Sequence, residues 1–112
     1  MTSQQMRERA TAALRLIAED VRQHMPYPHA GNRACIAVVA NLFDGAQYPL
    51  NLNYLRSLDS AQTQACLDII AYDVAGGFGT PEIQDWGVID REELCGWFEK
   101  LERRTAPAPQ FG

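Results

Sequence analysis

The sequence predicts an all-α protein, a compact bundle of four main helices joined by irregular loops and by short extended or one-turn segments. Apolar residues recur at spacings of three and four in four separate segments. Proline or glycine follows each of the first three segments. Hydrophobic residues make up 46% and charged residues 21%, a balance that lets a globular protein bury a core. We therefore expect a single helical domain over residues 1–104 and a disordered tail over 105–112.

The first two helices are expected over residues 3–24 and 32–44. Pro26 ends the first, because proline disfavours helical geometry in the residue before it. The second is apolar on nearly every side, which predicts the central helix of the bundle, and Asn32 is placed to cap its start. A strand over 35–39 is the alternative, because three of its residues are β-branched. The predicted apolar face of the first helix consists of Met6, Ala10, Ala13, Leu14, Ile17 and Val21.

Capping boxes mark the starts of the third helix and the last helix. Asp59 with Gln62, and Asp90 with Glu93, are spaced so that each pair can satisfy free backbone amides. The last helix is expected to run to about residue 104, and residues 46–58 to form a short extended piece before a short helix. The predicted buried faces are Cys66, Ile69, Ile70 and Val74, with Tyr72 beside them, and Leu94, Trp97, Phe98 and Leu101.

The charge is unevenly distributed along the chain. Residues 1–58 hold six arginines against four acids, whereas residues 59–112 hold four basic residues against ten acids, giving +2 and −6. Both later helices are net acidic, so neither suits a phosphate backbone, and no nucleic-acid partner is expected. No apolar run approaches the roughly 18 residues of a membrane span, and no signal peptide is evident. We expect a cytoplasmic protein with no membrane contact.

The segment from Gly87 to Leu94 resembles the second half of an EF-hand calcium loop. Extending the loop backwards places Trp86, which has no side-chain oxygen, at a position where the motif needs a calcium ligand. A turn at Gly87 and a helix cap at Asp90 explain the same residues without metal. A metal-dependent enzyme or metal-binding protein that uses the acidic loop 82–93, or the loop of His24 and His29, is kept as the alternative function.

The cysteines and histidines of the chain give little support for a catalytic or metal-binding site. Cys35, Cys66 and Cys95 lack the short spacing of a zinc or thiol-exchange site, and buried free cysteines act as small hydrophobic residues. His24 and His29 flank two prolines and do not share a helical face. We therefore predict no catalytic residue, no metal ligand and no cofactor.

Four aromatic residues fall in or beside irregular segments: Tyr27, Tyr48, Phe78 and Trp86. One interpretation is that they fix loops onto a small core. The other is that they form an exposed apolar patch, which in a small protein marks a site for a protein partner or for self-association. The acidic residues nearby favour a basic partner. We take these four as the candidate partner-binding residues.

Between two expected helices, residues 32–70 contain in order Ala40-Asn41-Leu42-Phe43-Asp44-Gly45, Leu50-Asn51-Leu52, Leu55 and Leu58-Asp59. With this order the stretch is similar to a family of short uncharacterised bacterial proteins carried on integrative and other mobile elements. Phe43 stands where tryptophans are usual in that family, and Asn51 replaces an Asp. The resemblance implies a helical fold and a genomic setting, but no activity and no catalytic residue. The expected function is therefore unknown in detail, with a non-catalytic interaction or accessory module of a mobile element preferred.

Overall fold

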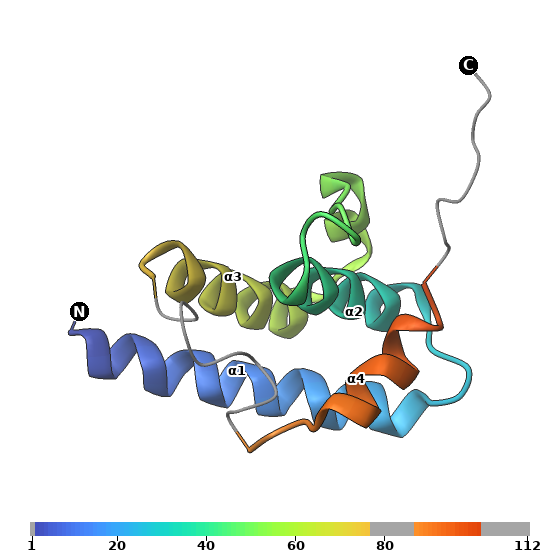
Figure 1. Cartoon of the computed structure of the whole chain (residues 1–112), viewed down its shortest axis with the longest axis horizontal. Coiled ribbons are helices and arrows are strands. Elements are labelled where there is room, and N and C mark those ends of the chain that lie inside the picture. Colours follow the sequence, from blue (N-terminus) through green and yellow to red (C-terminus); the bar gives the residue numbers. More distant parts are fainter. Residues whose placement is uncertain (1, 77–86, 102–112) are drawn as a thin grey trace.

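The computed structural model describes residues 2–76 and 87–101, which form helices and no strand, and this confirms the predicted all-α class (Figure 1). α2 and α3 lie on the same side of α1, and α4 crosses the C-terminal part of α1 (Figure 1). No helix in the described ranges is both long enough and apolar enough to cross a lipid bilayer. The predicted tail 105–112 lies outside the described residues. The elements are α1 (Ser3–His24), α2 (Ala30–Phe43), η1 (Leu52–Ser57, a 3₁₀ helix), α3 (Ser60–Val74) and α4 (Arg91–Phe98).

α1 begins and ends where the sequence predicted. Its predicted apolar face is buried from Ala10 to Val21, with Ala18 added, and Met6 packs partly buried against the core. The capping box at the start of α1 was not predicted from the sequence. Thr2 Oγ1 accepts a hydrogen bond from the Gln5 amide at 3.1 Å, and Gln5 Oε1 accepts one from the Thr2 amide at 2.8 Å.

α2 is the central helix, as predicted, and packs against α1, α3, α4 and η1. Every residue from Ala34 to Ala40 is buried, and the strand alternative over 35–39 is wrong. The prediction that Asn32 precedes the helix as its cap is also wrong. The helix begins at Ala30, and Asn32 is its third residue, whose Oδ1 accepts a hydrogen bond from the His29 amide at 2.9 Å. Asn32 therefore accepts the hydrogen bond of a free backbone amide at the start of α2, although it lies in the first turn of the helix and not before it.

The segment over 46–58 and the start of α3 agree with the prediction. Asn51 has an extended backbone and caps η1, because its Oδ1 accepts a hydrogen bond from the Asn53 amide at 2.9 Å. At α3, Asp59 Oδ1 accepts a hydrogen bond from the Gln62 amide at 2.7 Å, and Gln62 Oε1 accepts one from the Asp59 amide at 3.0 Å. The predicted capping box is thus present in full.

The prediction that Val74 is buried is wrong, since its side chain is 81% exposed. Successive helical residues are about 100° apart around the axis, so Val74, five positions after Ile69, lies on another side of α3. Tyr72, three positions after Ile69, is buried instead. The buried face of α3 therefore turns toward Tyr72 in its last turn.

α4 is shorter than the predicted helix, because it ends at Phe98. Beyond it the Leu101 amide donates a hydrogen bond to the Phe98 carbonyl at 3.1 Å, three residues back, which makes a tighter turn than an α-helix. Asp90 caps α4 as predicted, with Oδ1 accepting from the Glu93 amide at 2.8 Å. Of the predicted inner face, Leu94, Trp97 and Phe98 are buried and Leu101 is partly buried.

The prediction of a complete capping box at the start of α4 is wrong. The Glu93 side chain, which should have completed it, is bound by Arg22 on α1. Arg22 Nε donates to Glu93 Oε2 at 2.6 Å, and Arg22 Nη2 donates to Glu93 Oε1 at 2.8 Å. The same Nη2 donates to the Val88 carbonyl at 2.9 Å. This two-point contact fastens the start of α4 to the end of α1.

Replacing Arg22 with alanine is expected to lower the free energy of unfolding by about 1 kcal/mol. The effect is modest because the Arg22 side chain is 45% exposed and water screens the ion pair. Arg15→Ala, at an exposed position of the same helix, is the matched control and is expected to change stability by less than about 0.5 kcal/mol. Urea denaturation of both variants measures the difference. Equal losses in the two variants would rule out a specific role for the contact with Glu93.

Candidate functional site

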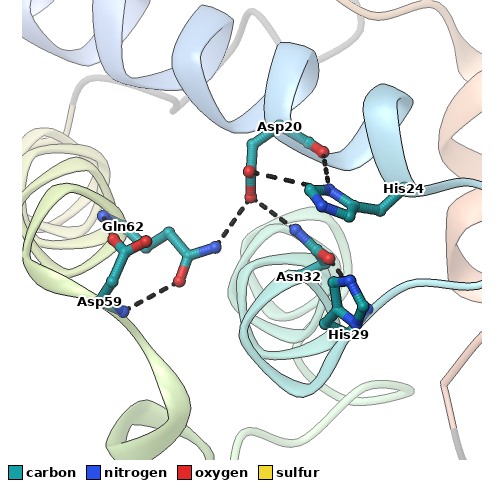
Figure 2. Close-up of polar contacts among 6 residues, drawn as sticks. All are labelled: Asp20, His24, His29, Asn32, Asp59 and Gln62. Carbon is teal, nitrogen blue, oxygen red and sulfur yellow. Dashed lines mark hydrogen bonds and ion pairs between the residues drawn. The ribbon is translucent and has the colours of Figure 1, made fainter.

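Polar side chains gather where the first turns of α2 and α3 meet α1 (Figure 2). Asp20 on α1 is the centre of this cluster. Its Oδ2 accepts hydrogen bonds from Asn32 Nδ2 at 2.6 Å and from Gln62 Nε2 at 2.8 Å. We call Asp20, Asn32 and Gln62 the Asp20 clamp, because one carboxylate holds the starts of two helices.

The two amides of the Asp20 clamp have equivalent roles. Asn32 and Gln62 are each the third residue of a helix, and each uses its side-chain oxygen to accept from the backbone amide preceding its own helix. Their nitrogens are then free to donate to Asp20, which lies near the positive ends of two helix dipoles. Asn32 is 2% exposed and Gln62 7%, and burial of such groups is costly unless they are hydrogen-bonded. The cluster is therefore fully explained as a structural fastening.

Gly31 lets α2 approach Gln62 closely enough for this arrangement. A Cβ atom at Gly31 would lie 2.7 Å from Gln62 Oε1 and 3.0 Å from the Ser57 carbonyl oxygen. Both distances are shorter than ordinary contacts, so any side chain at this position would displace the Gln62 amide. Glycine is required here by space.

His24 and His29 lie together at the edge of the clamp, although they flank a loop in the sequence (Figure 2). Their ring centroids are 4.7 Å apart in an edge-to-face arrangement. His24 Nδ1 lies 2.8 Å from the Asp20 backbone oxygen, to which it donates when the ring carries a hydrogen on Nδ1, and 3.9 Å from the Asp20 carboxylate. The described residues contain no group of three or more His, Cys, Asp or Glu side chains that could hold a metal ion. The histidine loop thus gives the metal-binding alternative no support.

The described part of the calcium-like segment is occupied by structural contacts. Gly87 has a backbone φ of +77°, which favours glycine, and Ile89 is buried. Asp90 caps α4, and Glu93 binds Arg22. The first half of the acidic loop 82–93, up to residue 86, lies outside the described residues.

The fold brings together two of the three cysteines. Cys35 on α2 and Cys66 on α3 are both buried, with their Sγ atoms 4.0 Å apart, whereas Cys95 on α4 is exposed. The hydrogen bond between the two thiols, together with burial, raises the pKa of Cys35 above its ordinary value. The same hydrogen bond lowers the pKa of Cys66. No sequence spacing signalled this contact.

A groove with a volume of about 390 Å³ lies between α4 and the chain that follows α2. We call it the α4 groove. The Tyr48 ring packs against the Phe98 ring, with centroids 4.9 Å apart, and Tyr54 is 42% exposed. Glu99 makes no ion pair with any other residue in 2–76 or 87–101. The residues of the groove that bear on chemistry are Tyr48, Asn51, Tyr54, Cys95, Phe98 and Glu99.

A larger hollow, of about 650 Å³, lies along the exposed side of α1 and is more open. Six of its seven lining residues come from α1 itself, and Tyr72 is the seventh. Side chains from a single helix diverge toward solvent and do not converge on a ligand. The α4 groove is therefore the better candidate, since α2, η1, α4 and the segments around them all contribute to it.

The structure separates the predicted partner-binding residues. Tyr27 is 84% exposed and precedes α2, whereas Tyr48 follows α2 and is half-buried in the α4 groove. The 14 residues of α2 span about 20 Å, so these two rings do not belong to one small patch. Phe78 and Trp86 lie outside the described residues. Whether any of the four binds a partner stays a prediction.

The other residues of the α4 groove were not predicted from the sequence. Tyr54 could have been found, because it is one of only four tyrosines and lies in the same irregular region as Tyr48. Cys95 and Glu99 carried no signal, because both follow from how α4 packs against α2.

The chain belongs to a family of unknown function (DUF7673), whose match covers residues 8–93 of the 112. No curated protein and no solved structure matches the chain.

Proposed function

We propose that this family member is a non-catalytic interaction module that binds a protein partner in the α4 groove through a positively charged side chain, arginine in particular. The observation that carries the proposal is that aromatic rings and a carboxylate without an ion-pair partner among the described residues line one groove. Its volume of about 390 Å³ is at the lower end for ligand sites, which suits a side chain of a bound peptide.

The chemistry of the lining favours a guanidinium group. Tyr48 and Tyr54 supply aromatic rings, and a cation near the face of an aromatic ring is attracted by the ring quadrupole. Glu99 supplies a carboxylate, which a guanidinium can bind through two parallel hydrogen bonds. A neutral or acidic side chain would gain neither interaction.

The charge around the α4 groove points to the same partner. Residues 87–101 contain four acidic residues and two basic ones, a net charge of −2. Of the two basic residues, Arg91 stacks over the Phe43 ring, 6.0 Å from its centroid. Complementary charge speeds the encounter with a basic partner and disfavours an acidic one.

The setting proposed for this module follows from the resemblance. We place it in the cytoplasm of a bacterium, as an accessory protein of a mobile element that acts as a single domain over residues 1–104. Tyr48 keeps its predicted role in partner binding, and Tyr54 and Glu99 join it. Tyr27 provides a test of the alternative, a patch formed by the loop aromatic residues, because it is exposed at the other end of α2.

The experiment uses fluorescent peptides of varied sequence that carry arginine at a fixed central position, each matched with a citrulline peptide that lacks the charge. The wild-type chain is expected to bind the arginine member about tenfold more tightly. Glu99→Gln should abolish this preference, and Tyr54→Ala should weaken arginine binding about tenfold. Tyr27→Ala is the matched tyrosine control and should leave binding unchanged.

Two outcomes contradict the proposal. One is equal binding of the arginine and citrulline peptides by the wild-type chain. The other is an equal loss of affinity in Tyr27→Ala and Tyr54→Ala, which would indicate that the partner binds a broader aromatic surface that includes Tyr27.

A further inference from the structure

Cys35 and Cys66 face each other across the packed helices α2 and α3. Their relative exposures are 0% and 1%, and their Sγ atoms are 4.0 Å apart. The S–S bond of a disulfide is about 2.0 Å long, so the two sulfur atoms must approach by about 2 Å to bond.

The Asp20 clamp fixes the position of this thiol pair. Cys35 lies three residues after Asn32, and Cys66 lies four residues after Gln62, so each thiol is one helical turn beyond a clamp amide. Asp20 binds both amides and thereby holds the first turns of α2 and α3 side by side (Figure 2). The two thiols are therefore kept within reach of each other.

We propose that Cys35 and Cys66 are a redox modification site, which a hydroperoxide converts into a disulfide that joins α2 to α3. In the first step the Cys66 sulfur attacks the peroxide, its O–O bond breaks, and sulfenic acid and an alcohol or water form. In the second step the Cys35 sulfur attacks the Cys66 sulfur, the S–S bond forms, and the S–O bond breaks with release of water. The two sulfurs lose two electrons, and the peroxide gains them.

Cys95 provides a built-in comparison. It is exposed, and the described residues place no second thiol near it. Peroxide should therefore reach Cys95 first and carry it to sulfinic acid, because no neighbouring thiol traps the sulfenic acid. Burial slows the attack on peroxide by the pair of Cys35 and Cys66. The second thiol of the pair, 4.0 Å away, then reacts with the sulfenic acid that forms. The two sites are thus expected to give different products.

The test exposes the folded Cys95→Ser chain to hydrogen peroxide and follows its intact mass. The expected result is the loss of two hydrogen atoms, reversed by dithiothreitol, and absent when Cys35→Ser or Cys66→Ser is added. The oxidised chain should also unfold at a temperature about 10 °C higher than the reduced chain, because the disulfide restricts the unfolded state. The mass change, its reversal by dithiothreitol and the shift in unfolding temperature are all measured on a chain with both core cysteines intact, so these three results do not depend on whether the Cys35→Ser or Cys66→Ser chain folds.

Two results would overturn the proposal. One is an unchanged mass at peroxide doses that fully oxidise Cys95 in the wild-type chain. The other is a gain of oxygen atoms at Cys35 or Cys66 that dithiothreitol does not reverse, since that product requires the two thiols not to react with each other.

Discussion

Replacing Asp20 with alanine is expected to lower the free energy of unfolding by about 3 kcal/mol. The substitution removes the acceptor shared by Asn32 Nδ2 and Gln62 Nε2, both of which belong to buried side chains. A buried donor left without an acceptor costs about 1–3 kcal/mol, and here two donors lose theirs at once. Urea denaturation followed by circular dichroism measures the change.

Glu19→Ala is the matched control, because Glu19 is an exposed carboxylate on the same helix. It is expected to change stability by less than about 0.5 kcal/mol. The double variant with Gln62→Ala should lose less than the sum of the two single losses, since removing either partner breaks the same hydrogen bond. Strict additivity would mean that Asp20 and Gln62 do not stabilise the fold through each other.

Replacing Trp97 with alanine is expected to cost about 4 kcal/mol, the largest loss of any single substitution considered. Trp97 is 1% exposed and is the largest of the fully buried side chains, so its removal leaves a cavity between α4 and the core. Trp97→Phe keeps most of the apolar contact and should cost clearly less. Thermal and urea unfolding compare the two. A loss for Trp97→Ala no greater than that for the exposed Tyr27→Ala would contradict the assignment of Trp97 to the core.

The helices were predictable where capping and periodicity agree. Asp59 both precedes an apolar face and has Gln62 three residues later, and the structure contains that capping box. At α2 the same reasoning misled, because His29 is not a typical cap and Asn32, which is one, acts from inside the helix. Val74 was misplaced because the buried face of α3 turns toward Tyr72 near its end.

The candidate sites were less predictable because they depend on contacts between distant residues. Asn32 and Gln62 each occupy a cap-related position in their own helix, but nothing in the sequence indicates that Asp20 accepts from both. Cys35 and Cys66 are separated by 31 residues and meet only because α2 packs on α3. The Glu93 side chain, expected to cap its own helix, is taken by Arg22 from 71 residues away. Residue spacing within one helix does not show whether a side chain will bind a neighbour in that helix or a residue far away in the sequence.

The most direct test of the α4 groove as the partner site is the alkylation rate of Cys95. This thiol lines the groove, whereas Cys35 and Cys66 are buried, so iodoacetamide should modify Cys95 first in the folded wild-type chain. A saturating arginine peptide is expected to slow this alkylation, and its citrulline match, at the same concentration, is not. Equal alkylation rates with and without the bound arginine peptide would show that the partner binds elsewhere on the molecule and not in the α4 groove.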